Sequence, residues 1–126
     1  MFQKTIPVIH VSDSLSAEDF YCKGLGFNRQ FSYRPDNTTN DPCYMGVIRD
    51  GAELHLSSFP SDGVAGAAVY VFVDDVDALH AELVAKGVPI DTPPVTHTWG
   101  TREMFLRDAD RNRIQFAQRR PVSAEP

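Results

Sequence analysis

The side chains with the clearest capacity for chemistry lie in one stretch near the C-terminus, from Trp99 to Phe116. The stretch contains the only tryptophan of the chain, which is followed by Gly100. A tryptophan before a glycine in a loop can form a stacking wall for a flat ligand, or it can pack as a rim residue. Arg102 and Glu103 follow, and they either form an interfacial ion pair or alternate outward along a strand.

The polar segment from Asp108 to Asn112 predicts a tight turn between two strands, because Asp and Asn tolerate left-handed backbone and hydrogen-bond to it locally. Asp-rich turns can also bind calcium, but the remaining ligands of such a loop are missing, and we expect turn chemistry. The sequence has no Gly-rich phosphate loop, nucleophile elbow or Cys–His dyad. Cys22 and Cys43 have neither metal nor redox spacing.

Length and charge limit the classes of function. At 126 residues the chain has the length of one domain. Its net charge of −5 argues against a nucleic-acid partner, which would require a basic face. No run approaches the roughly 20 apolar residues that cross a bilayer, and no apolar signal segment precedes the first strand. We therefore expect a cytoplasmic protein without a membrane partner.

The chain contains an internal repeat. The hairpin that ends at Gln118 has an earlier counterpart from Tyr44 to Ser57, in which Arg49-Asp50 matches Arg107-Asp108. The copies stay roughly 60 residues apart and keep the order strand, helix, strand, hairpin, which is typical of a duplicated module. The predicted modules span about 4–59 and 67–118 of a single domain, 1–126.

Residue periodicity predicts the elements of each module. In the first module these are strand 5–11, a helix capped by Ser14 or Ser16 and stopped by Gly24 or Gly26, strand 27–33, a mobile polar loop 34–42, and hairpin strands 43–48 and 53–58. In the second they are strand 67–73, a helix capped by Asp74 or Asp75 and ended by Gly87, an irregular edge strand within 88–98, a hairpin within 104–118, and a frayed tail, 119–126.

The predicted fold is α+β, with two βαβββ modules that form a curled mixed sheet around a concave cleft. Strand residues that point into this cleft are the candidates for function. His55 is the histidine expected to face it, either as a binding donor or as a satisfied interior group. His97 lies beside Trp99 and either contacts a ligand or belongs to the loop alone.

Six motifs in this order resemble the vicinal oxygen chelate superfamily, which includes glyoxalase I, extradiol dioxygenases, fosfomycin-resistance enzymes and bleomycin-resistance proteins. They are Val11-Ser12-Asp13, Phe20-Tyr21, Leu25-Gly26-Phe27, Val73-Asp74-Asp75-Val76-Asp77, Lys86-Gly87-Val88 and Leu106-Arg107-Asp108-Ala109-Asp110. Within the superfamily the chain is most similar to the bleomycin-resistance proteins. That likeness is carried by Ile6-Pro7-Val8, Gly46-Val47-Ile48-Arg49-Asp50 and Trp99-Gly100-Thr101-Arg102-Glu103.

The resemblance implies four metal-ligand positions, which in this chain are Ile6, His55, Ala68 and Gln115. Two of these side chains cannot ligate, and the set without a carboxylate would hold a divalent ion poorly. We therefore expect no metal, no cofactor and no catalytic residue. The alternative is a metal-dependent lyase or dioxygenase of the glyoxalase superfamily that uses His55 and Gln115 with a further ligand such as His10.

The bleomycin-resistance proteins that the chain resembles are non-catalytic dimers. They sequester a cationic drug in clefts at the dimer interface, and the first strand is partly exchanged between subunits. The resemblance implies that the aromatic stacking positions are Tyr44, Tyr70 and Trp99, with Phe72 on the same strand face as Tyr70. Tyr44, Tyr70 and Phe72 line the cleft or belong to the core. The predicted ligand-binding residues are Tyr44, Tyr70, Trp99, His55, Phe72 and Arg102. A sensor or carrier of another metabolite is a third reading.

Overall fold

The computed structural model describes residues 1–120, which fall into two compact units. The first unit comprises Met1–Ala67 together with the turn Asp108–Asn112, and the second comprises Ala68–Arg107 together with the chain from Arg113 onward. The predicted frayed tail lies outside the described residues beyond Arg120, whereas Arg119 belongs to a strand.

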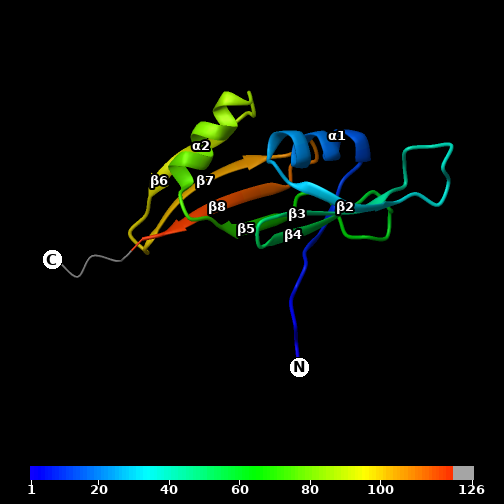
Figure 1. Ribbon diagram of the computed structural model, residues 1–126, viewed down its shortest axis with the longest axis horizontal. Coiled ribbons are helices and arrows are strands. Elements are labelled where there is room, and N and C mark those ends of the chain that lie inside the picture. The colour runs from blue at the N-terminus through cyan, green and yellow to red at the C-terminus, as the bar shows by residue number, and fades with distance from the viewer. Residues whose placement is uncertain (121–126) are drawn as a thin grey trace. The chain divides into compact units, whose positions relative to one another are not determined.

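The first unit contains four strands and one helical segment (Figure 1). The elements are β1 (Val8–His10), α1 (Ser14–Glu18), the π-helical turn η1 (Asp19–Gly24), β2 (Asn28–Tyr33), β3 (Tyr44–Arg49) and β4 (Ala52–Ser57). The strand order is β1-β4-β3-β2, with β1 parallel to β4 and the other pairs antiparallel.

The helical segment begins one residue earlier than its serines predict. Asp13 is the N-cap, because its carboxylate accepts hydrogen bonds from the backbone N–H groups of Leu15 and Ser16. Neither predicted serine caps the helix; Ser14 instead donates its hydroxyl to the carbonyl of Asn40. The helical turns end at Gly24, and Gly26 follows the C-cap Leu25 with a positive φ of 78°, which favours glycine.

Alternation along β3 and β4 separates the core of the first unit from an open sheet face. Met45 and Val47 on β3 and Leu54 and Leu56 on β4 are fully buried. Each such side chain contributes roughly 1.5–3 kcal/mol of burial free energy. His55 lies between the two leucines and therefore points to the opposite face of the sheet.

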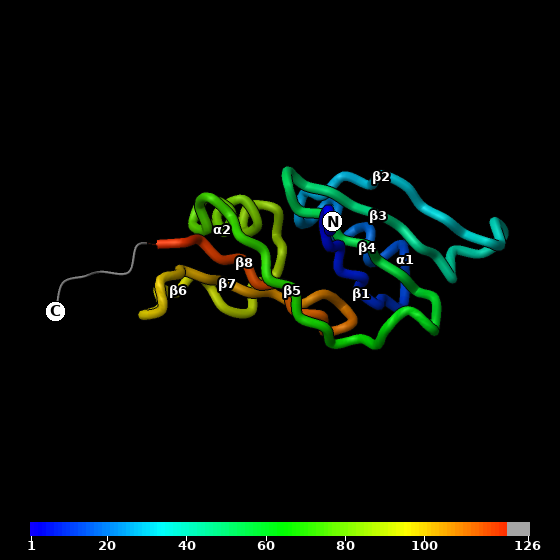
Figure 2. The backbone as a smooth tube through the Cα atoms, turned by 90° about the horizontal axis from the view of Figure 1, so that it is seen from below, coloured from blue at the N-terminus to red at the C-terminus, as the bar shows by residue number. Residues whose placement is uncertain are grey.

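The second unit repeats the plan (Figure 2). Its elements are β5 (Ala68–Phe72), α2 (Val76–Ala85), β6 (Thr92–Thr96), β7 (Thr101–Arg107) and β8 (Arg113–Arg119). The strand order is β5-β8-β7-β6, with β5 parallel to β8. Asp75 caps α2 as predicted, since its side chain accepts from the N–H of Ala78. The register shifts along β6 where the prolines predict an irregular edge.

The predicted pair of βαβββ modules is confirmed. In the described part of the chain the strands form two four-stranded mixed sheets, each with a parallel pair at one side. Met104 and Leu106 on β7 and Ile114 and Phe116 on β8 are buried, in the positions that Met45, Val47, Leu54 and Leu56 occupy in the first unit. None of the described helices is long and apolar enough to span a membrane.

The turn Asp108–Asn112 is tightly hydrogen-bonded within the first unit. One oxygen of Asp108 accepts from the backbone of Asp110 and Asn112, and the other accepts from the hydroxyl of Tyr21 at 2.8 Å. The Asn112 amide accepts from Gly66 and Ala67 and donates to the carbonyl of His10. These bonds satisfy the turn's polar side chains, as turn chemistry requires.

The loop 34–42 is anchored near its C-terminal end. Asp41 accepts hydrogen bonds from the backbone N–H of Ser14 and the hydroxyl of Ser58. Arg34 donates to the carbonyl of Asn40 and to the hydroxyl of Ser14. The loop that was predicted to be mobile therefore carries several side-chain hydrogen bonds, most of them near Asp41.

Candidate ligand-binding faces

The open sheet face of the first unit is aromatic. The Tyr44 hydroxyl lies 2.8 Å from Nδ1 of His55, with which it shares a hydrogen bond. Phe31 of β2 stacks nearly parallel to Tyr44 at 12° and meets His55 edge-on, with ring centroids 5.3 Å apart. The ring of Phe31 covers Gly46, where a side chain would overlap it. Glycine at this position therefore leaves the space that the Phe31 ring occupies.

A second aromatic pair lies at the end of β2, where Tyr33 is the last residue of the strand. Tyr33, which is 58% exposed, stacks on Phe59 with ring centroids 6.4 Å apart and planes within 7°.

Burial raises the pKa of the Tyr44 hydroxyl, and the carboxylate of Asp62 adds to that shift. The hydroxyl of Tyr44 is therefore a neutral hydrogen-bonding group at physiological pH.

Sequence reasoning did not identify three aromatic residues of the first unit. Phe31 and Tyr33 are two residues apart in a predicted strand, so they share a face by the period of two. That spacing could have identified them, because both carry large rings at the exposed edge strand β2. Phe59 follows β4 in a loop, and no sequence pattern indicates its stacking partner.

The second unit is organised around Glu103, a buried carboxylate with only 4% of its surface exposed. It accepts hydrogen bonds from the hydroxyls of Tyr70 and Thr101, the amide of Gln115 and, at 3.4 Å, the indole N–H of Trp99. Burial acts to raise the pKa of Glu103, but the four hydrogen bonds outweigh it and hold the pKa below its usual range. The side chain is therefore an anion surrounded by neutral donors.

The sheet order explains how residues from separate strands meet at this carboxylate. β8 lies between β5 and β7, with Tyr70 opposite Gln115 and Glu103 opposite Ala117. All four positions share one face of the sheet by alternation. Ala117 is small, so the Tyr70 side chain reaches over β8 to Glu103.

Exposed rings surround the carboxylate. Tyr70 and Phe72 lie edge to face with centroids 5.2 Å apart, and about half of each side chain is exposed. Trp99 is 64% exposed and stacks on His97, with centroids 4.1 Å apart and planes within 8°. The guanidinium of Arg119 lies 3.8 Å above the Phe72 ring, so one face of that ring already binds a cation.

The two units place different chemistry at equivalent positions. In the first, Tyr44 on β3 hydrogen-bonds diagonally to His55 on β4, whose direct partner is Gly46. In the second, Glu103 on β7 hydrogen-bonds diagonally to Gln115 on β8, whose direct partner is Phe105. The duplication therefore provides a hydroxyl–imidazole pair in one module and a carboxylate–amide pair in the other.

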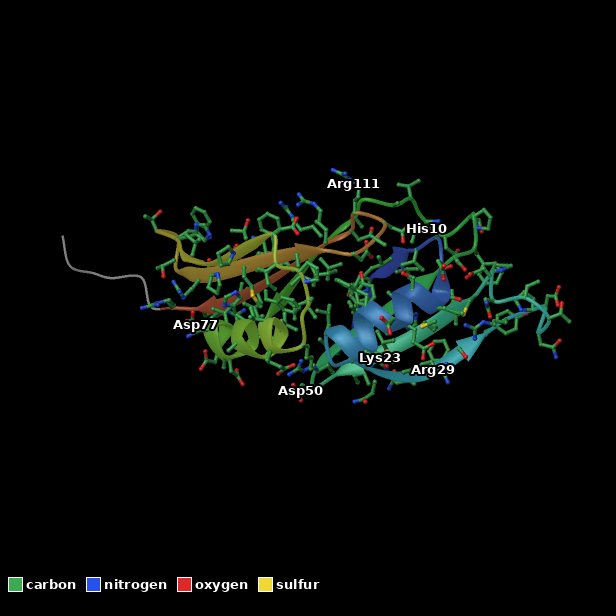
Figure 3. All side chains as sticks on the ribbon, turned by 90° about the horizontal axis from the view of Figure 1, so that it is seen from above. His10, Lys23, Arg29, Asp50, Asp77 and Arg111 are labelled. Carbon is green, nitrogen blue, oxygen red and sulfur yellow. The ribbon has the colours of Figure 1, made fainter. Side chains whose placement is uncertain are left out.

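Arg102 lies on the other side of its sheet. Its guanidinium makes two hydrogen bonds of 3.0 Å to Asp77 of α2 and one of 2.9 Å to Thr96 (Figure 3 labels Asp77). Its ion pair is with Asp77, and the hydrogen-bond partners of Glu103 are the neutral groups described above. The predicted ligand-binding residues thus divide into Tyr44 and His55 in the first unit, Tyr70, Phe72 and Trp99 on one face of the second, and Arg102 on its helix side.

The four positions implied for a metal do not fit a divalent ion. Ile6 and Ala68 carry hydrocarbon side chains, and the Gln115 amide donates to Glu103. One nitrogen of His55 is occupied by Tyr44. His10 shares the sheet face of His55, and its Nδ1 is buried without a hydrogen-bond partner among the described residues. Two histidines without a carboxylate remain a poor donor set, and across residues 1–120 no three His, Cys, Asp or Glu side chains gather in a potential metal site.

A family model described as "Glyoxalase superfamily protein" matches residues 1–122. Among solved structures, the chain is similar to TnmS3, an antibiotic binding protein from a Streptomyces species. The two share 29% identity with a TM-score of 0.72, over 94% of this chain and 98% of that one. The chain is also similar to the bleomycin-binding protein of bleomycin-producing Streptomyces verticillus, which was solved with copper(II)-bleomycin. Here the identity is 28% and the TM-score 0.70, over 92% and 95% of the two chains.

A member of the glyoxalase/bleomycin resistance protein/dioxygenase superfamily from Sphaerobacter thermophilus shares the fold. The identity is 24% and the TM-score 0.73, over 93% of this chain and 98% of that chain. No match is found among curated proteins.

Proposed function

This chain belongs to the glyoxalase superfamily, and from that premise we propose that it is a non-catalytic binding protein of the bleomycin-resistance type. In this proposal it sequesters a flat, cationic, aromatic small molecule at a cleft between the two copies of a homodimer. Tyr44, His55, Tyr70, Phe72 and Trp99 supply the stacking and hydrogen-bonding groups. Arg102, although predicted with them, is paired with Asp77 on the opposite face of β7, so the proposal gives it no contact with the ligand.

The observation that carries the proposal is the exposure of large aromatic rings on sheet faces that the helices leave uncovered. Tyr70, Phe72 and Trp99 are each about half exposed or more, although they lie beside a well-packed sheet. An aromatic contact with a flat or cationic ligand contributes about 0.5–2 kcal/mol beyond burial. Three or four such contacts support useful affinity without a covalent step.

The chemistry of the family's metal positions supports binding rather than catalysis. Two of the four side chains are hydrocarbons, and the remaining two already make hydrogen bonds within their own sheets. The net charge of −5 favours the approach of a positively charged ligand, most strongly at low ionic strength. Both features fit a protein that binds a cationic ligand without reacting with it.

Calorimetric titration with copper(II)-bleomycin tests the proposal. We expect tight binding, with one or two ligands per dimer, and weaker binding by the Trp99→Ala variant. Val84→Ala is the matched control, because Val84 is an exposed apolar residue on α2, away from the aromatic rings. No heat of binding at micromolar protein would rule out the drug assignment.

Stoichiometric zinc, nickel, iron or manganese in the purified protein would favour the lyase or dioxygenase alternative. Sedimentation equilibrium measures the dimer separately.

A further inference from the structure

We infer that Glu103 is a positioning residue for ligand binding, whose carboxylate holds the rings of Tyr70 and Trp99 as a preformed stacking wall on the second unit. The identity of the ligand rests on the function proposed above. The mechanism rests on the hydrogen bonds of the carboxylate, which are independent of any ligand.

The environment of Glu103 is unusual for a buried charge. The four groups that donate to it are neutral. Removing a carboxylate from water is costly unless hydrogen bonds or an opposite charge compensate, and an apolar side chain of similar size would avoid that cost. Packing alone therefore does not account for a carboxylate here, whereas the arrangement of its donors does.

Those donors come from three strands and a loop. Tyr70 lies on β5, Gln115 on β8 and Thr101 on β7, while Trp99 precedes β7. About half of Tyr70 and more than half of Trp99 are exposed, and exposed side chains ordinarily exchange between rotamers. A shared acceptor removes that freedom before a ligand arrives, which lowers the entropy lost on binding.

Trp99 is restrained from two directions. Glu103 accepts from the edge of the indole, and His97 covers one of its faces in parallel contact. Its other face is the one left for a flat ligand. Tyr70 is similarly restrained at its hydroxyl by Glu103 and at its ring by the edge contact with Phe72.

The first experiment needs no ligand, because Trp99 is the only tryptophan and its emission reports the wall directly. Time-resolved fluorescence anisotropy compares wild type, Glu103→Gln and the double variant Glu103→Gln, Gln115→Glu. We expect Trp99 to rotate with the whole protein in wild type and to gain a fast local component in Glu103→Gln. The double variant moves the carboxylate to position 115, opposite Tyr70, where it accepts from the new amide N–H at position 103. The amide oxygen at position 103 then remains to accept from Tyr70 and Trp99, so the fast component should be suppressed.

The matched control is Glu53→Gln, which removes a partly exposed carboxylate that pairs with Lys4 in the first unit. It should leave the Trp99 anisotropy unchanged. Circular dichroism verifies the fold of each variant. If Glu103→Gln fails to fold, Tyr70→Phe takes its place, because it keeps the ring and releases only one tether. Tyr70→Phe should weaken binding without freeing Trp99.

The second experiment measures copper(II)-bleomycin binding by calorimetry. We expect Glu103→Gln to weaken binding about tenfold and the double variant to recover most of that loss. If wild type binds no copper(II)-bleomycin, the drug assignment fails, and the anisotropy experiment alone decides the role of Glu103. A folded Glu103→Gln variant with wild-type anisotropy would overturn the inference, as would unchanged affinity in a protein that does bind.

Discussion

Tyr70 on β5 donates its phenolic proton to the buried carboxylate of Glu103 on β7, across the intervening strand β8. The hydrogen bond spans 33 residues of sequence and joins a half-exposed ring to a nearly inaccessible anion. The hydrogen bond also acts to raise the pKa of the Tyr70 hydroxyl. The two residues therefore define a rigid aromatic surface with a fixed charge behind it.

We expect Tyr70→Phe to reduce the free energy of unfolding by about 1 kcal/mol, because it removes one hydrogen bond to a charged acceptor that keeps three other donors. Urea denaturation measures the change. Tyr33→Phe is the control, since Tyr33 is also an exposed strand tyrosine and its ring stacks on Phe59. Equal losses in the two variants would contradict a specific role for the Tyr70 hydroxyl.

Glu103 should make stability depend on acid pH. Its folded pKa is held below the usual value of 4.5, so its contribution is present above that pH. The contribution is lost as pH falls below 4.5 toward the folded pKa, because the carboxylate must then be protonated. Wild type should therefore lose stability more steeply than Glu103→Gln in this range. Parallel pH profiles from urea unfolding would argue against the lowered pKa.

Tyr21 should have the opposite effect at alkaline pH. Burial, followed by the nearby carboxylates of Asp108 and Asp110, raises its pKa far above the ordinary 10.0. A raised folded pKa means that the stabilisation is complete below pH 10 and declines above it, because the unfolded tyrosine ionises first. Unfolding experiments across pH 10 should show a steeper decline for wild type than for Tyr21→Phe.

At neutral pH the same Tyr21→Phe variant should cost roughly 1.5–3 kcal/mol, because Asp108 loses a donor in a buried position. Tyr33→Phe again serves as the control. A cost below that of the control would mean that the turn Asp108–Asn112 satisfies Asp108 without the Tyr21 hydroxyl.

Gly46→Ala should change the aromatic packing of the first unit more than its stability. The added methyl would overlap the Phe31 ring, which must leave its stack on Tyr44. Replacing a strand glycine removes a backbone penalty of about 0.5–1 kcal/mol, which offsets part of the disturbance. Near-ultraviolet circular dichroism should therefore change while the unfolding free energy stays within about 1 kcal/mol. Gly51→Ala is the control, because a methyl there would meet no atom within 4 Å. An unchanged aromatic spectrum for Gly46→Ala would show that Phe31 relaxes in place.

The order of the elements and the duplication could be predicted from the sequence, because both depend on local periodicity. Leu54, His55 and Leu56 alternate between core and open face in the predicted way, and Asp75 caps its helix. The prediction of Ser14 or Ser16 as the cap of the first helix was wrong, since Asp13 directly before them has a similar capping capacity. Only the surrounding contacts select Asp13, because Ser14 is engaged by Asn40 and Asp41.

By itself the sequence determined that the chain carries two βαβββ modules, each with aromatic residues in its strands. These features follow from side-chain spacing within a few residues. Only the tertiary structure decided the partners of Arg102 and Glu103, which are adjacent in sequence but point to opposite faces of β7. Arg102 meets Asp77 on α2, whereas Glu103 meets Tyr70 and Gln115 on strands separated from it in sequence. Strand order and register place those donors together, and both are set by the packing of the whole sheet rather than by any local pattern.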